Sequence, residues 1–429
     1  MQNNSVIIIG AGAAGLMAAR VLAKAGKQVK ILEARNRLGG RIHSLNNEQF
    51  FKHVELGAEF IHGDLPVTLQ LLNEANISYY PAGGEMWYFR DGEFKTNEAF
   101  PDWEELMEKL YALAEDCSIH DFLQREFPGD KYSRLRNSVE RFATGYDTAD
   151  PRKVSSFALR DEWEHEDDNE QHRVSGGYST MIDYLAEEIK STGSVIHLNT
   201  PVKNISWTSG EVTIESIDGE QFKAEKVLVA LPLGVLQAGD ISFNPPIPNH
   251  NEAFGQIGFG AIIKVLFEFN QPFWEDKHSE ALAGRSMKYM GFILSDQPIP
   301  TWWTQEPDSR SVLTGWLGGS PAFEKKDMAT EELFELSLQS IGAIFSRDVQ
   351  WLKDNLLAYS IQNWTNEVYT KGSYAYDMVG SHNARQTLLQ PVENTLYFAG
   401  EYLYEGTAMG TVEAALISGN NTAQAILKA

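Results

Sequence analysis

Three glycines near the start of the chain, Gly10, Gly12 and Gly15, have the G-x-G-x-x-G spacing of a dinucleotide-binding turn. In such a turn the first glycine permits a tight bend, and the second lets the backbone approach a pyrophosphate. The third lets a helix pack closely on a strand. An acid, Glu33, follows at the spacing from which a carboxylate hydrogen-bonds an adenosine ribose. These residue types therefore suit a nucleotide cofactor, provided that regular elements hold them in place.

The residues around the glycines predict those elements. Val6 to Ile9 is a short β-branched run typical of a buried strand, and Ala13 to Ala25 is rich in helix-forming alanine and leucine. Gln28 to Leu32 predicts a second strand that ends directly before Glu33. Because the free N–H groups of a helix N-terminus can face phosphates, we expect a strand–helix–strand unit that binds a dinucleotide. The alternative is the same unit without a ligand.

A second group, Ala34-Arg35-Asn-Arg-Leu-Gly39-Gly40-Arg41, follows the acid. A guanidinium here can reach a pyrophosphate from the other side, and the glycine pair leaves room for a ribityl chain. The alternative is a basic surface loop. Residues Gly10 to Arg41 resemble the N-terminal segment of FAD-dependent amine oxidases, which include monoamine oxidases, polyamine oxidases and lysine-specific histone demethylases. The resemblance implies an α/β fold with a Rossmann-like FAD-binding domain and a discontinuous α+β substrate-binding domain.

Further segments resemble parts of the family that surround the flavin: Leu56 to His62, the strand beginning at Val202, and the turn Gly400-Glu401 before a C-terminal helix. The N-terminus of that helix would stabilise negative charge on the reduced flavin. The motifs and the resemblance together predict cofactor contacts from Gly10, Gly12, Ala14, Gly15, Glu33, Ala34, Arg35, Gly39, Gly40, Arg41, Leu56, Gly57, Ala58, Glu59, Val202, Trp364, Gly400, Glu401, Thr411 and Val412. We assign no metal ligands.

Lys264 is the first candidate for a catalytic residue. It lies in an alternating apolar run, so its ammonium must meet a water or an acceptor. It matches the family lysine that holds a water at flavin N5. The alternative is a lysine whose ammonium reaches solvent from an edge strand.

Four more candidates rest on the resemblance. Trp364 and Tyr374 match the two aromatic residues that line the flavin face, which suits a ring and a cationic amine, although such residues also occur in ordinary cores. His62 stands where animal-type polyamine oxidases carry an active-site histidine, and a structural histidine is the alternative. Thr411 stands where monoamine oxidases and many polyamine oxidases have a second tyrosine and histone demethylases have threonine. Ser373 replaces the cysteine that bonds the flavin in monoamine oxidases, so we expect FAD to be held non-covalently.

Composition restricts the ligand and the environment. The formal net charge of −23 argues against nucleic-acid binding and favours a cationic ligand. With Cys117 as the one cysteine, no signal-peptide pattern and no hydrophobic tail, we expect a cytoplasmic protein without membrane attachment. The acidic run Asp161 to Glu170 is either a solvated loop or the lip of a funnel for cations.

The order of motifs along the chain predicts how the domains are assembled. We expect the FAD-binding domain to comprise residues 1–80, 173–240 and 381–429, and the substrate-binding domain 81–172 and 241–380. Residues 82–172 are expected to be mainly helical. Three alternating runs between Val202 and Ala224, separated by Ser209-Gly210 and Asp218-Gly219, predict a β-meander.

The resemblance implies a reaction. A hydride passes from the carbon beside an amine to FAD, the imine hydrolyses, and dioxygen reoxidises the flavin to give hydrogen peroxide. We expect a polyamine oxidase, since no arginine in the flavin-facing motifs of the substrate domain offers a carboxylate partner. The alternatives are a monoamine oxidase, an L-amino-acid oxidase, or a flavin-binding redox module without turnover. No long helical insertion supports a demethylase, and the oligomeric state stays open.

Overall fold

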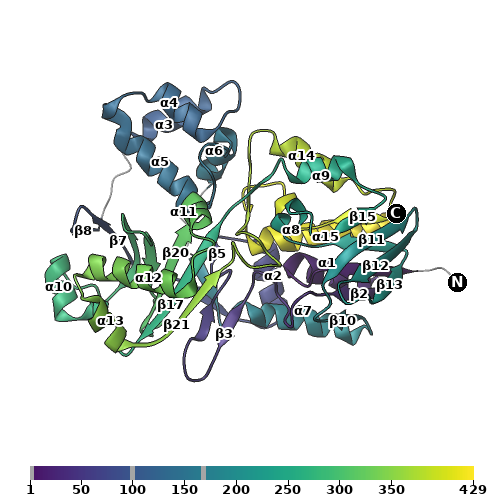
Figure 1. Ribbon diagram of the computed structural model, residues 1–429, viewed down its shortest axis with the longest axis horizontal. Coiled ribbons are helices and arrows are strands. Elements are labelled where there is room, and N and C mark those ends of the chain that lie inside the picture. The colour runs from purple at the N-terminus through teal and green to yellow at the C-terminus, as the bar shows by residue number, and fades with distance from the viewer. Residues whose placement is uncertain (1–3, 97–101, 166–170) are drawn as a thin grey trace.

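A five-stranded parallel sheet contains the first strand of the chain at its centre (Figure 1). The computed structural model describes residues 4–96, 102–165 and 171–429. The strand order is β10 (Val195–His197), β2 (Gln28–Leu32), β1 (Ser5–Ile9), β14 (Lys226–Val229) and β23 (Leu396–Phe398). The predicted first strand–helix–strand unit is confirmed, with α1 (Ala13–Lys24) between β1 and β2.

The two faces of this sheet are covered by different layers. Val6 and Ile8 of β1 pack with α1, α7 (Ser179–Ser191) and α15 (Val412–Lys428). Ile7 and Ile9 point to the opposite face and pack with a second sheet. Burial on both faces explains why β1 is a continuous apolar run and not an alternating one.

The second sheet is the predicted β-meander with one added strand. Its order is β13 (Gln221–Ala224), β12 (Glu211–Ser216), β11 (Val202–Thr208) and β15 (Ser242–Asn244). Strand β15 pairs in parallel with β11. Helices α8 (Leu233–Gln237), α9 (Pro248–Phe254) and α14 (Ser381–Leu389) contribute to the same hydrophobic cluster. This layer therefore continues beyond residue 240, where the sequence analysis ends that segment.

A mixed seven-stranded sheet forms the other half of the molecule. Its order is β21 (Leu356–Asn363), β17 (Ile262–Phe269), β20 (Val312–Gly318), β19 (Thr301–Trp303), β18 (Met290–Ser295), β7 (Glu85–Arg90) and β8 (Glu93–Lys95). The hydrophobic cluster on this sheet includes residues of η2 (Phe273–Glu275), α11 (Gly319–Glu324), α12 (Thr330–Phe345) and α13 (Val349–Asn355), and α10 (Lys277–Ala283) lies next to them. Lys264 lies in β17, which is hydrogen-bonded on both sides, so it is not on an edge strand.

The segment 82–172 is only partly helical, which corrects the sequence expectation. Helices α3 (Trp103–Tyr111), α4 (Ile119–Glu126), α5 (Ser133–Gly145) and α6 (Ser156–His165) and the short η1 (Asp130–Tyr132) form a separate group at the upper left of Figure 1. Residues 85–95 instead form the β7–β8 hairpin. Asp91 and Gly92 at its turn have φ of 54° and 80°. This Asp-Gly pair between β-prone runs is a hairpin signal that the sequence analysis did not use.

Short strands between the large sheets carry many of the site residues. They form a three-stranded sheet, β5 (Ile61–His62), β9 (Gln171–Val174) and β6 (Tyr79–Pro81), and two pairs, β3 (Ser44–Asn46) with β4 (Lys52–Glu55) and β16 (Gly258–Phe259) with β22 (Ala375–Tyr376). The remaining elements are α2 (Pro66–Glu74) and η3 (Glu401–Leu403). No helix in the described ranges is long and apolar enough to cross a membrane.

Candidate active site

A cavity of about 2400 Å³ extends from the glycine motif to Lys264 in the seven-stranded sheet. Small-molecule sites commonly occupy ~300–1,000 Å³, so this space can hold a dinucleotide and a second molecule. We call the part lined by Gly10 to Arg41 the glycine end and the part around Lys264 the lysine end. All of the residues that the sequence analysis assigns to the site line the cavity except Gly15.

Gly15 acts behind the cavity wall. A Cβ at this position would lie 2.1 Å from the Gly10 carbonyl oxygen and 3.3 Å from the Ala230 Cβ. The helix therefore packs on the strand as closely as the motif predicts. The first turn of α1 then presents Gly12, Ala13 and Ala14 to the cavity.

Glu33 organises the glycine turn through its carboxylate. It is buried and accepts the Ala11 N–H at 2.8 Å and the Arg35 N–H at 2.9 Å, one on each oxygen. Each carboxylate oxygen has a further lone pair, and Glu33 lines the cavity. The same side chain can thus hold the loop and accept hydroxyl groups of a ribose.

Arg41 and Glu401 connect the two ends of the chain at the middle of the cavity. Arg41 Nη1 donates to Glu401 Oε1 at 2.8 Å and to the Ser373 carbonyl oxygen at 2.7 Å. The second Glu401 oxygen accepts the Ala375 N–H at 3.2 Å. Arg35 is held differently, by Glu367 and by the Thr370 hydroxyl at 2.8 Å. Both arginines line the cavity, so their charges are available to a diphosphate.

Trp364 and Gly57 have fixed positions in the cavity wall. The Trp364 indole N–H donates to the Leu56 carbonyl oxygen at 2.8 Å. A Cβ on Gly57 would lie 1.8 Å from the Arg41 carbonyl oxygen and 3.4 Å from the Trp364 ring. The sequence analysis expects Gly57 as a cofactor contact, for which a small residue allows close approach of a ring. The structure adds a different cause, which is close packing against the chain itself.

Lys264 meets the acceptor that its apolar surroundings require. Its Nζ donates to Glu59 Oε2 at 2.7 Å and to the Gly57 carbonyl oxygen at 3.1 Å. Glu59 Oε1 accepts from the Trp303 indole at 3.0 Å and from Arg173 Nε at 3.2 Å. Lys264 and Arg173 lower the pKa of Glu59, against the effect of its burial. The structure thus gives Glu59, expected as a cofactor contact, a second role as the partner of Lys264.

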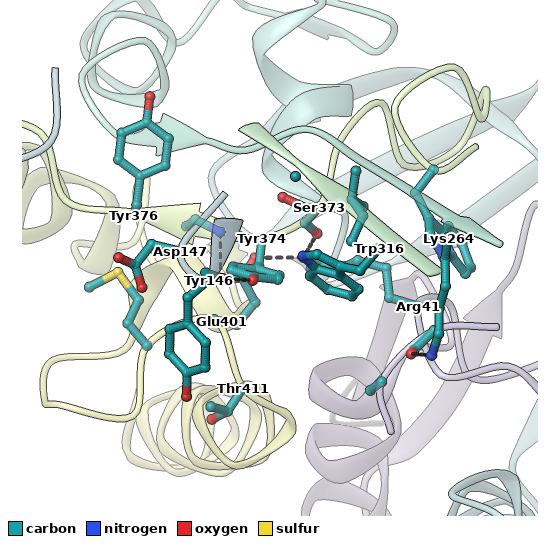
Figure 2. Close-up of a pocket in the computed structure, with 18 of the residues that line it drawn as sticks. Arg41, Tyr146, Asp147, Lys264, Trp316, Ser373, Tyr374, Tyr376, Glu401 and Thr411 are labelled. Carbon is teal, nitrogen blue, oxygen red and sulfur yellow. Dashed lines mark hydrogen bonds and ion pairs between the residues drawn. The ribbon is translucent and has the colours of Figure 1, made fainter. Parts of the chain in front are cut away.

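Away from Lys264 the cavity carries tyrosines and the acid Asp147 (Figure 2), and His62 is also part of its lining. The Tyr374 hydroxyl donates to the Tyr146 carbonyl oxygen, and the Tyr146 hydroxyl lies 3.4 Å from His62 Nδ1. Burial lowers the pKa of His62 to about 4, so the ring is neutral at pH 7. Burial, together with the nearby Asp147, raises the pKa of Tyr374 above its ordinary value. In Figure 2 Lys264 and Arg41 lie on the other side of the pocket from Asp147.

Thr411 is the N-cap of α15. Its hydroxyl oxygen accepts the Ala414 N–H at 3.2 Å, and the hydroxyl donates to the Ala408 carbonyl oxygen at 2.6 Å. The helix N-terminus, with Thr411 and Val412, faces the cavity. Ser373 also lines the cavity, with its hydroxyl 2.6 Å from the Thr148 hydroxyl. Cys117 lies elsewhere, in the hydrophobic cluster of helices α3 to α6.

Several lining residues were not identified from the sequence. Trp303, Trp316 and the pair Tyr146-Asp147 come from three separate segments with no motif spacing, so only the folded chain brings them together. Arg173, which pairs with Glu59, was also not identified. Trp316 is fixed by its indole N–H, which donates to the Gly145 carbonyl oxygen at 2.7 Å.

Arginines are present in the cavity wall, which corrects one expectation. Besides Arg41 and Arg35, the wall includes Arg90, Arg141 and Arg152. The wall also includes Glu140, Asp147, Asp150, Asp161 and Glu162. The first part of the acidic run thus reaches the cavity at the end of α6, whereas residues 166–170 lie outside the described residues. The expected lack of arginine partners therefore no longer argues against an amino-acid substrate.

The residues present fit FAD. The helix N-terminus of α1, the guanidinium groups of Arg35 and Arg41, and the carboxylate of Glu33 supply anion and hydroxyl partners along one wall. The N-terminus of α15 and the indole of Trp364 line the next part. These groups would hold FAD through its diphosphate and ribose, and FAD would supply the hydride acceptor.

Comparison with known proteins gives a match over nearly the whole chain. The family profile described as flavin containing amine oxidoreductase matches residues 13–427. Putrescine oxidase from Kocuria rosea is 28% identical, with 99% of this chain and 95% of that protein aligned. Polyamine oxidase 4 from Oryza sativa subsp. japonica is 25% identical, with 97% and 87% aligned. Human lysine-specific histone demethylase 2 is 27% identical over 93% of this chain, which spans only 50% of that protein.

Solved structures show the same fold. Putrescine oxidase bound to putrescine superposes with a TM-score of 0.80 at 21% identity and 99% coverage of both chains. Cyclohexylamine oxidase from Brevibacterium oxydans IH-35A gives a TM-score of 0.80 at 20% identity, again with 99% of both chains covered.

Proposed function

The chain belongs to the family of flavin-containing amine oxidoreductases, and from this premise we propose that it oxidises an amine with FAD as the hydride acceptor. The observation that carries the proposal is the continuity of the cavity. Residues that suit a diphosphate and a ribose at the glycine end share it with the buried lysine and the aromatic residues at the other end. A redox module without turnover would not need this additional space for a second molecule.

FAD, when bound, supplies the hydride acceptor and the site at which dioxygen reacts. The protein supplies orientation and charge. Trp364, fixed by Leu56, and Tyr374, fixed by Tyr146, bound the space in which the amine lies. His62 is neutral at pH 7 and can accept a hydrogen bond from an amine N–H. The α15 N-terminus, capped by Thr411, favours negative charge on the reduced cofactor.

We propose that the substrate is a polyamine. Five carboxylate residues of the segment from α5 to α6 line the cavity, and the chain carries a formal net charge of −23. Both features favour a ligand with more than one positive charge. Relatives named as polyamine oxidases and putrescine oxidase align over most of their own length, which supports this substrate class.

The test compares kcat/KM for spermine, spermidine, an acetylated polyamine, arylalkylamines and L-amino acids, each at low and high ionic strength. Peroxide formation and anaerobic bleaching of the flavin are followed separately. A polyamine should be preferred, with a KM that rises with salt as the field is screened. Preference for an arylalkylamine or an amino acid by more than about tenfold, or ~1.4 kcal/mol, would contradict the polyamine assignment.

FAD should be held without a covalent bond. Ser373 cannot form a thioether, and Cys117 lies among the helices α3 to α6. Acid precipitation should therefore release intact FAD and leave a colourless pellet. Flavin absorbance that stays in the washed pellet would contradict this proposal.

A further inference from the structure

Glu59 is buried among groups that come from three other strands. Lys264 lies in β17, Arg173 in β9 and Trp303 in β19, and Glu59 itself lies between β4 and β5. The relative exposures of Lys264, Glu59 and Arg173 are 1%, 6% and 5%. Charged groups so far from water are stable only when paired and hydrogen-bonded, so this arrangement is a specific one.

The two oxygens of the Glu59 carboxylate have different partners. Oε1 accepts from the Trp303 indole at 3.0 Å and from Arg173, whose Nε and Nη2 lie at 3.2 and 3.1 Å. Oε2 accepts from Lys264 Nζ at 2.7 Å. Since Trp303 and Arg173 hold one oxygen, the other has a fixed direction toward the lysine.

Arg173 is itself fixed by the backbone. Its Nη1 donates to the Glu306 carbonyl oxygen at 2.6 Å, and its Nη2 donates to the Thr304 carbonyl oxygen at 3.0 Å. The guanidinium also lies 4.7 Å from the Phe60 ring centroid. Rotation of the Glu59 side chain away from Lys264 would therefore break several hydrogen bonds at once.

The ammonium of Lys264 has three N–H donors. Two are directed to Glu59 and the Gly57 carbonyl oxygen. Lys264 lines the cavity, so the third donor is available there. Three further ionisable groups interact electrostatically with this network: Glu55 with Lys264 and Glu59, Tyr80 with Arg173 and Glu59, and Glu306 with Arg173.

We propose that Glu59 is a positioning residue, which holds the Lys264 ammonium in place with one donor directed into the cavity. Lys264 then acts as a fixed charge and hydrogen-bond donor, and it does not accept a proton during amine oxidation. The inference rests on the proposed function, because only bound FAD gives that charge a reacting partner. Without the carboxylate, two buried cations would remain unbalanced, and Lys264 is the one that can release a proton.

The test uses the FAD-loaded protein and sulfite, an anion that adds to flavins and bleaches them without any amine. Its dissociation constant is measured from pH 6 to 9.5 for the wild type, Glu59→Gln, Lys264→Met and the double variant. Each value is divided by the wild-type value at the same pH, which cancels the ionisation of sulfite. For Glu59→Gln the ratio should rise at least tenfold over this range as Lys264 loses its proton. For both variants that lack Lys264 the ratio should be independent of pH.

A constant ratio in Glu59→Gln, or a rising ratio that persists in the double variant, would overturn the proposal. Glu55→Gln is the matched control, since Glu55 is equally buried and accepts from Ser44 and from the Tyr178 N–H. Burial raises the pKa of Glu55 to about 7, so an amide resembles its protonated form at pH 6, where the Glu55→Gln ratio should stay within twofold of one.

If Glu59→Gln does not retain FAD, Glu59→Asp provides the second variant. Aspartate keeps the charge but shortens the side chain by one methylene. The sulfite dissociation constant of Glu59→Asp, divided by the wild-type value, should exceed three at every pH. A value within twofold of one would overturn the positioning role. Since sulfite binding needs no amine, a negative amine panel combined with these results would disprove the proposed substrate and leave the role of Glu59 supported.

Discussion

The glycine end of the cavity comes from one continuous stretch, Gly10 to Arg41, whereas the groups around Lys264 come from four separate segments. At the glycine end the backbone forms most of the site, through the turn, the N-terminus of α1 and the N–H groups that donate to Glu33. At the lysine end side chains hold one another in place. A backbone site depends on the size of its residues, and a side-chain network depends on their charge and length. Substitutions at the two ends should therefore have different effects, weaker FAD binding at the glycine end and slower flavin reactions at the lysine end.

The largest effect is expected from Lys264→Met at the lysine end. Removal of a buried charge beside the reacting cofactor should slow flavin reduction, reoxidation or both by about a hundredfold, while FAD stays bound. Stopped-flow rates and the ratio of FAD to protein measure this. Lys226→Met is the matched control, since Lys226 is also buried but does not line the cavity, and it should change the rates less than twofold. Equal rates for Lys264→Met and the wild type would remove Lys264 from the mechanism.

The opposite effect, weaker FAD binding with little change in turnover, is expected from Gly15→Ala at the glycine end. The new Cβ would lie 2.1 Å from the Gly10 carbonyl oxygen, so α1 must move away from the turn. The dissociation constant for FAD should rise at least tenfold, about 1.4 kcal/mol, while turnover per bound FAD changes little. Gly255→Ala is the control, because its Cβ would meet its nearest atom at 3.4 Å. Normal FAD affinity in Gly15→Ala would show that the close approach is dispensable.

Thr411→Tyr tests whether the boundary between the two ends shapes the substrate. The ring would enter the cavity, and kcat/KM for bulky secondary amines should fall about fivefold relative to small primary amines. The substitution also removes the cap of α15, which costs about 1 kcal/mol of stability. Thr411→Ala removes the cap without adding a ring, so it should keep the wild-type order of substrates. If Thr411→Tyr also keeps that order, Thr411 does not define the pocket.

The smallest effect concerns His62 and pH. Its pKa is about 4 in the folded protein, below the ordinary value of 6.5, so the folded state disfavours the protonated ring. The contribution of the neutral ring is complete above pH 6.5 and is lost as the pH falls toward 4. On going from pH 7.5 to 5, Tm should fall ~1–2 °C less in His62→Gln than in the wild type. His382→Gln, at a side chain that is 72% exposed, is the control and should behave like the wild type. An unchanged pH dependence in His62→Gln would mean that His62 is not desolvated.

Local sequence is sufficient to predict the secondary-structure elements and turns whose conformation depends on neighbours along the chain. The strand–glycine–helix–strand unit and the meander with its Gly turns follow from periodicity and turn chemistry, and the structure has them at those positions. The family could also be recognised from Gly10 to Arg41. The Asp91-Gly92 pair marks the β7–β8 hairpin, which the expectation of a mainly helical segment 82–172 does not include.

The arrangement of side chains at the lysine end depends on contacts between distant segments, which the sequence alone does not reveal. Glu59 is separated from Arg173 by 114 positions and from Lys264 by 205, so no local pattern relates them. The sequence required an acceptor for a lysine in an apolar strand but could not choose it among the many carboxylates. That choice depends on which loops the sheets bring to the same place, since a buried charge is compensated by whatever group the fold delivers within hydrogen-bond distance.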